Sequence, residues 1–135
     1  QAAQDETVKE IVQARAFVSD KINATVRECF RLLGVQPMQT SGRLQEIFVE
    51  DFRRELAAIQ APKAKLLYVL TSANLLDHVR IGELVALTAA ADLSGHPAVG
   101  VLLETCLADK MALSERTRRY IRNWIETKVE ERRAA

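Results

Sequence analysis

The fold is decided by residues 75–114, which read LLDHVRIGELVALTAAADLSGHPAVGVLLETCLADKMALS. Apolar residues recur at helical spacing on both sides of the short segment Leu93-Ser94-Gly95-His96-Pro97. Glycine allows the backbone conformation that ends a helix, and proline is favoured in the first turn of the next helix. The stretch therefore predicts two long antiparallel helices joined by a tight turn.

The same signals divide the rest of the chain into helical segments. Gly34 ends a first apolar stripe, and Ser41 is placed to cap a shorter helix after a loop that contains Pro37. Pro62 separates this shorter helix from a third segment, which is apolar on more than one face and is therefore expected to be central. We expect helices at residues 5–33, 41–59, 62–93 and 97–131.

Three long helices and one shorter helix bury their apolar stripes most simply as an up-and-down four-helix bundle. We therefore predict an all-α fold with a single domain over residues 1–135. The shorter helix cannot cover the whole length of its neighbours, so part of their apolar stripe needs another cover. A second copy of the chain is the simplest cover, which predicts a homodimer, and an upstream helix would serve equally well.

The composition excludes several classes of protein. Of the 135 residues, 48% are hydrophobic and 27% are charged, as in a folded chain. The net charge of +1 predicts no general attraction to nucleic acid or anionic lipid, and no run of residues approaches the length of a membrane span. The two cysteines, Cys29 and Cys106, have no partner at metal or redox spacing and are expected to be buried thiols. These features favour a cytoplasmic protein.

Two expected helices carry residues that can bind a metal ion. Asp77 and His78 lie on one and Asp109 on the other, and iron, manganese or zinc suits such ligands. Arg80 and Lys110 lie beside them, however, and a cation opposes a metal ion. The alternative interpretation is that these side chains form ordinary polar or ion-paired positions. Further acids would supplement the ligands only where packing turns them inward, namely Glu28, Glu83 and Glu104.

No other motif in the sequence indicates chemistry. A glycine-rich phosphate loop, a nucleophile elbow and a Cys-x-x-C pair are all missing, and no small-molecule substrate is evident. The arginines between residues 116 and 122 are interspersed with acids, as on a solvated helix face, so we expect no nucleic-acid partner.

The order of the segments resembles that of the bacterial stress-associated ferritin-like proteins of the YciF type. The resemblance rests on Phe30-Arg31-Leu32-Leu33-Gly34 after a long helix, on Asp77-His78 in the third segment, and on the run from Leu102-Leu103-Glu104 to Ser114 in the fourth. It covers most of the chain. It implies a ferritin-like bundle and, in members with intact motifs, a di-metal centre.

The chain departs from this family at the positions of its metal ligands. The typical Glu-His-Tyr-Glu motif reads Asp77-His78-Val79-Arg80 here, and only Asp109 remains acidic in the run Ala108-Asp109-Lys110-Met111. The glutamate pair expected in the first long helix falls near Phe17 and Val18, whose side chains cannot bind metal.

We therefore expect a non-catalytic or metal-deficient ferritin-like bundle without a cofactor, stress-associated and homodimeric. One alternative is a ferritin-like oxidoreductase or iron-handling protein that binds iron, manganese or zinc through Asp77, His78 and Asp109. Another is a helical module that binds a protein partner through the groove beside the shorter helix.

Overall fold

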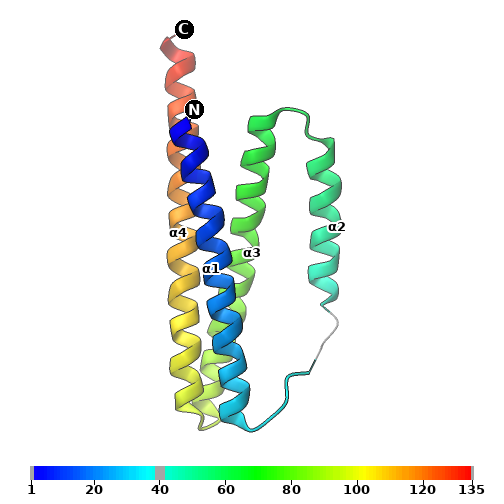
Figure 1. Ribbon diagram of the computed structural model, residues 1–135, viewed down its shortest axis with the longest axis vertical. Helices are drawn as coiled ribbons and strands as arrows, with labels where there is room; N and C mark the ends of the chain where they lie inside the picture. The colour runs from blue at the N-terminus through cyan, green and yellow to red at the C-terminus, as the bar shows by residue number, and fades with distance from the viewer. Residues whose placement is uncertain (1, 39–41, 135) are drawn as a thin grey trace.

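The computed structural model describes residues 2–38 and 42–134, which form four α-helices in the predicted order. These are α1 (Ala2–Leu33), α2 (Arg43–Ala58), α3 (Pro62–Leu93) and α4 (Pro97–Ala134). Their directions alternate along the chain (Figure 1). The prediction of an all-α chain with three long helices and one shorter helix is confirmed.

Glycine ends both α1 and α3, as the sequence predicts. Gly34 and Gly95 have φ values of 67° and 77°, in the left-handed region that favours glycine. After Gly95, the amide of His96 donates to the carbonyl oxygen of Ala91 at 2.9 Å, and the same pattern closes α1. These bonds satisfy carbonyl groups that the end of a helix would leave without partners.

The ends of the other helices differ by a few residues from the predictions. The predicted cap Ser41 lies outside the described residues, and α2 begins after Gly42 with no side-chain capping bond. It ends at Ala58 because Ile59 adopts an extended backbone, so α2 has 16 residues and is shorter than expected. At the outer ends, α1 begins at residue 2 rather than 5, and α4 continues to residue 134 rather than 131.

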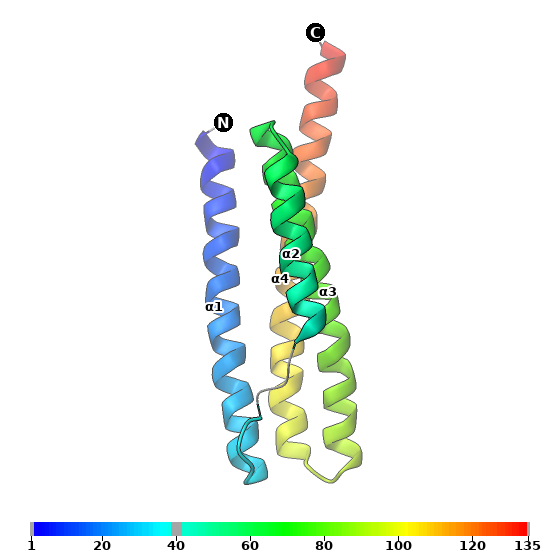
Figure 2. The same ribbon diagram turned by 90° about the vertical axis from the view of Figure 1, so that its right-hand side faces the viewer.

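The four helices form a row that does not close into a ring. Helix α4 packs against both α1 and α3, whereas α2 packs only against α3. Within the described residues, no Cα atom of α1 lies within 8 Å of a Cα atom of α2 or α3. Figures 1 and 2 both show α2 beside α3 and separated from α1. The bundle is therefore open between α1 and α2.

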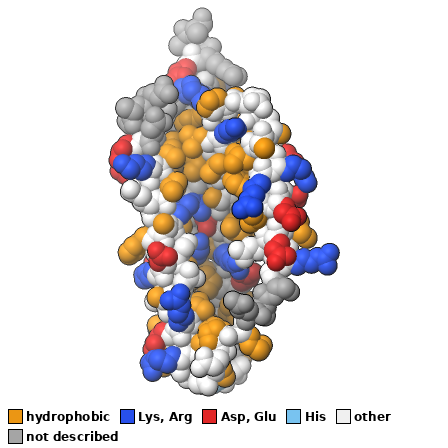
Figure 3. All heavy atoms as spheres, turned by 45° about the vertical axis from the view of Figure 1, so that its right-hand side comes forward, with side chains coloured by type: hydrophobic (Ala, Val, Ile, Leu, Met, Phe, Trp, Pro, Cys, Tyr) orange, Lys and Arg blue, Asp and Glu red, His pale blue; other side chains and the backbone are white. Residues whose placement is uncertain are grey.

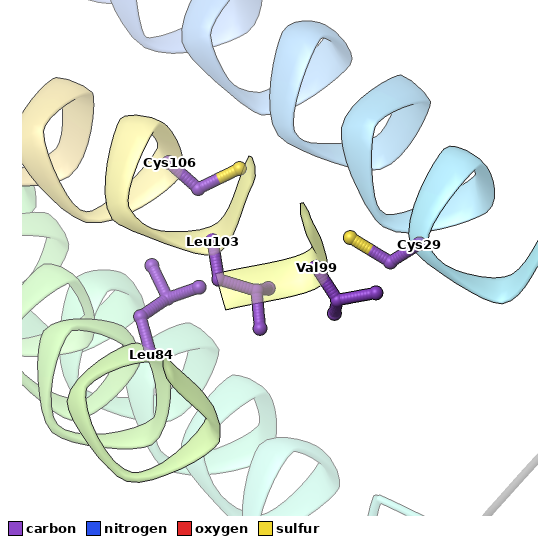
Figure 4. Packing of buried hydrophobic residues seen from close by; sticks show 5 residues of the cluster. All are labelled: Cys29, Leu84, Val99, Leu103 and Cys106. Atoms are coloured by element: carbon purple, nitrogen blue, oxygen red, sulfur yellow. The ribbon is translucent and has the colours of Figure 1, made fainter. Parts of the chain in front are cut away.

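The apolar core lies where α1, α3 and α4 meet near the turn between α3 and α4. Its buried members come from all three helices and point toward one another in Figure 4: Cys29, Leu84, Val99, Leu103 and Cys106. Further buried apolar side chains lie nearer the other end of the helices, at Ile11, Leu70 and Leu113. Among the described residues, no helix has the length and apolar character needed to cross a membrane.

Candidate functional site

A buried polar layer joins the three long helices midway along the bundle. On α3 its centre is Asp77, which lies between the buried residues Leu70 and Leu84 along the sequence. On α1 the corresponding residue is Arg15. It follows the buried residue Ile11 by four positions and therefore lies on the same face of the helix, toward the core. Helix α4 contributes Lys110, Ser114 and Thr117.

Both carboxylate oxygens of Asp77 face cations. The Nη2 atom of Arg15 lies 2.7 Å from Oδ2, and the Nζ atom of Lys110 lies 3.1 Å from Oδ1. The side chain of Asp77 is only 2% exposed, and those of Arg15 and Lys110 are 17% and 13% exposed. The layer is therefore an ion-paired cluster of one carboxylate and two cations, largely removed from water.

Hydrogen bonds hold the polar layer in position. Arg15 donates from Nη2 to the hydroxyl oxygen of Thr117 at 3.1 Å and from Nη1 to the carbonyl oxygen of Ala73 at 3.3 Å. Close by, the hydroxyl of Ser114 donates to Oδ1 of Asn74 at 2.8 Å. One arginine thus contacts both α3 and α4 from α1. Among the described residues, its Nε atom and Oδ2 of Asp77 have no hydrogen-bond partner, so the short contact between Arg15 and Asp77 is ionic rather than an aligned hydrogen bond.

The predicted residues His78 and Asp109 do not join Asp77. The exposed ring of His78 contacts its own helix, where Nδ1 lies 2.8 Å from the carbonyl oxygen of Asn74. Because a carbonyl oxygen accepts, Nδ1 carries the proton in this contact. Asp109 lies 2.6 Å from Nζ of Lys21, in a separate ion pair between α4 and α1. The structure therefore distributes the three residues over three different environments.

The supplementary acids also lie outside the polar layer. Glu28 binds Arg31 on the surface of α1, Glu83 binds Arg80 on α3, and Glu104 is exposed. Within the described residues, no three His, Cys, Asp or Glu side chains are grouped so that they could hold a metal ion. A divalent cation beside Asp77 would also face two fixed positive charges, and nearby charges dominate such sites. The residues present do not fit a metal centre.

The two cysteines are buried, free thiols in the apolar core. Burial raises the pKa of both Cys29 and Cys106. Since the thiolate is the reactive form, a raised pKa keeps both side chains protonated and unreactive near neutral pH. These cysteines thus have the character of small core residues, as the sequence predicts.

The basic stretch on α4 is ion-paired along its length. Arg118 and Arg119 both donate to Glu115, Arg122 donates to Glu126, and Arg116 reaches Glu10 on α1. Each pair is exposed, so each contributes little to stability. The local charge of this face is reduced by these acids.

Glu115 should titrate far below an ordinary glutamate. Hydrogen bonds from Arg118 and then Arg119 lower its pKa to about 2 from a usual 4.5. Because the folded-state pKa is the lower one, these ion pairs contribute to stability above pH 4.5 and the contribution is lost as the pH falls toward 2. In an NMR titration, replacing both arginines by alanine should return the Glu115 midpoint toward 4.5.

The control for this titration is Arg116→Ala, because Arg116 pairs with Glu10 and not with Glu115. It should leave the midpoint of Glu115 unchanged. A wild-type midpoint already near 4.5 would show that the two arginines do not hold this carboxylate in solution.

The sequence pointed to Asp77, Lys110 and Asp109 but not to Arg15 as a partner of Asp77 or to Lys21 as the partner of Asp109. The signal for Arg15 is its place in the apolar stripe, four residues after Ile11 and three before Val18. A charged residue at such a position must find a buried partner or leave the core. Lys21 carries no comparable signal, because about half of its side chain is exposed.

Compared with protein-family models, curated proteins and solved structures, the chain matches none.

Proposed function

We propose that this chain is a non-catalytic ferritin-like helical bundle with an ion-pair network in place of a metal centre. It works as a homodimeric, stress-associated structural protein of the cytoplasm. The observation that carries the proposal is the environment of Asp77, the one predicted ligand that is fully buried, whose two oxygens each face a cation. The positions around it hold Arg15 and Lys110 where a metal site would need further acids or histidines.

Electrostatics explains why such a network replaces a metal ion rather than binding one. A buried carboxylate is stable only when a positive charge lies close to it. Arg15 and Lys110 supply that charge from the protein itself, through α1 and α4. The network can therefore join the three long helices without any bound ion, as a metal ion would do in a bundle whose ligands are all anionic or neutral.

The remaining parts of the proposal have separate support. The ferritin-like and stress-associated roles derive from the sequence resemblance, with which four helices in the order long, short, long, long are compatible. The two buried free thiols are compatible with a reducing compartment. The opening between α1 and α2 leaves apolar surface available for a second copy.

Metal content tests this function directly. After incubation with Fe(II), Mn(II) or Zn(II) and desalting, elemental analysis of the tag-free protein should find far less than one metal ion per chain. Near-stoichiometric metal that is lost in the variants Asp77→Ala, His78→Ala and Asp109→Ala would contradict the proposal. It would favour the ferritin-like oxidoreductase or iron-handling alternative.

The double substitution Arg15→Glu with Lys110→Glu should create a metal site. It removes both cations from Asp77 and places up to three carboxylates in one buried layer, where they repel one another until a divalent ion binds. Zinc at about 100 times its dissociation constant should then stabilise the variant by about 2.7 kcal/mol. Thermal unfolding with and without zinc measures this effect.

The matched control is Lys63→Glu with Lys65→Glu, which makes the same change of charge at exposed positions in the first turn of α3. Its thermal unfolding should not respond to zinc. If the core variant folds poorly, the single change Lys110→Glu gives the same comparison with less charge repulsion. An equal response to zinc in the core and surface variants would show that Asp77 does not nucleate a site.

A further inference from the structure

The opening between α1 and α2 is a groove with α3 as its floor, lined by both apolar and polar side chains. Figure 3 shows apolar side chains gathered in the upper part of this face. A depression of ≈ 480 Å³ lies farther along it, and every helix contributes to its lining. Its apolar lining residues come from α1 and α3: Ile22, Val26, Leu76, Leu84 and Leu87.

Helical periodicity extends the groove beyond this depression. Val12 lies seven residues before the lining residue Ser19 and so shares its face of α1. On α3, Val69 lies seven residues before Leu76. Val12 and Leu87 are each more than half exposed, at 52% and 53%. Exposed large apolar side chains therefore lie toward both ends of this face of the molecule.

The exposed area of the chain exceeds that of an ordinary monomer. Its accessible surface is 9674 Å². A folded monomer of 15.1 kDa exposes about 7,100 Å² by the usual scaling with mass, so the excess is about 2,600 Å². A standard protein interface buries about 800 Å² on each partner, and obligate homodimers bury more. The excess is therefore enough for an extensive dimer interface.

The charges in the groove are already paired within one chain. Lys110 faces Asp77, and Arg80 lies 2.6 Å from Glu83 while it also donates to Gln45 on α2. A partner that bound through charge complementarity would need unpaired charges of one sign here. Internally paired charges instead allow two identical faces to meet without strong repulsion, as a two-fold interface requires.

We propose that the groove between α1 and α2 is the interface with a second copy of this chain, related by a two-fold axis. The inference rests on the homodimer of the proposed function and names its surface. Each copy closes the open side of the other, so the apolar floor on α3 becomes a shared core. The layer of Arg15, Asp77 and Lys110 then lies beneath the dimer interface, farther from water than in the single chain.

Sedimentation analysis over a range of protein concentrations tests this interface. The wild-type protein should have twice the 15.1 kDa mass of the chain. The variant Val12→Glu with Leu87→Glu places two charges in each groove, at positions whose exposure lets the single chain tolerate them. It should raise the dimer dissociation constant by roughly 100-fold or more, with unchanged helix content by circular dichroism.

The matched control is Leu93→Glu with Val101→Glu. These side chains are 90% and 61% exposed and lie outside the groove lining, so the control should remain dimeric. Dimers that persist in the groove variant would overturn this inference alone and leave the homodimer in place. A wild-type protein that is monomeric at all concentrations would overturn the homodimer as well, and the groove would then belong to another helix or partner.

A second measurement covers the case in which the groove variant does not fold. The melting temperature of a dimer rises with protein concentration, because association stabilises the folded state. The milder change Leu87→Gln should weaken this dependence, whereas Leu93→Gln should preserve it. Equal dependence in both variants would place the interface elsewhere.

Discussion

Replacing Asp77 by alanine is expected to lower the free energy of unfolding by about 3–5 kcal/mol, because it leaves two cations without a counter-charge inside the bundle. Arg15 and Lys110 are fixed by their helices and largely buried, at 17% and 13% exposure. Arg15 cannot turn fully into water without breaking its hydrogen bonds to Ala73 of α3 and Thr117 of α4. The destabilisation therefore comes from the charges that remain rather than from the small cavity that alanine leaves.

Chemical denaturation at fixed protein concentration measures this effect. The control is Asp51→Ala, since Asp51 is also paired with an arginine, Arg54, but is 55% exposed on α2. Exposed pairs contribute about 0–1 kcal/mol, so this change should be small. Equal losses in the two variants would mean that water reaches Asp77 as readily as it reaches the surface.

A triple variant separates the cost of unpaired charge from the value of the network. Changing Arg15, Asp77 and Lys110 together to leucine removes every member of the ion-paired cluster. Replacing a buried ion pair by apolar residues is often neutral or stabilising, so this variant should recover most of the stability that Asp77→Ala loses. A triple variant as unstable as the single one would show that the cations are not the source of the loss.

The ends of the helices could be predicted because their signals are local. Gly95 and Pro97 mark the turn between α3 and α4, and Pro62 marks the start of α3, each through backbone geometry that neighbouring residues hardly alter. The start of α2 has no comparable side-chain cap. Both ends of α2 therefore differ from the prediction, whereas each of the other helices differs at one end at most.

The membership of the polar layer could be predicted only in part. Neighbouring residues in a helix point about 100° apart, so Asp77 and His78 cannot both face the core, and only Asp77 does. The same geometry separates Lys110 from Asp109, which reaches Lys21 instead. Which residue of each pair turns inward depends on how the helices rotate about their axes, and that is set by packing between distant segments.

The open side of the bundle follows from the shortness of α2. The sequence predicts that this helix cannot cover its neighbours, but not that it would leave α1 altogether and pack on α3 alone. The stacked rings of Phe52 and Tyr68, 5.6 Å apart, help to hold α2 against α3. Such aromatic contacts add to apolar burial and favour this position over the gap beside α1.

Leu103→Ala is the second change from which we expect a large effect, a loss of about 2–5 kcal/mol in the free energy of unfolding. Leu103 is 7% exposed and lies on α4 in the cluster that contains Cys29 of α1 and Leu84 of α3 (Figure 4). A void at this position removes contacts that join all three long helices. Because α1 and α3 have no close backbone contact, their packing depends on side chains such as this one.

The control for Leu103→Ala is Leu93→Ala, which removes the same atoms from a side chain that is 90% exposed. Substitutions at such surface positions usually change stability by less than about 0.5 kcal/mol. Both variants should be unfolded at the same protein concentration, because a dimer would make stability depend on it. If Leu103→Ala lowered the free energy of unfolding as little as Leu93→Ala, the polar layer rather than the apolar core would hold the three helices together. The loss caused by Asp77→Ala should then be larger than about 5 kcal/mol.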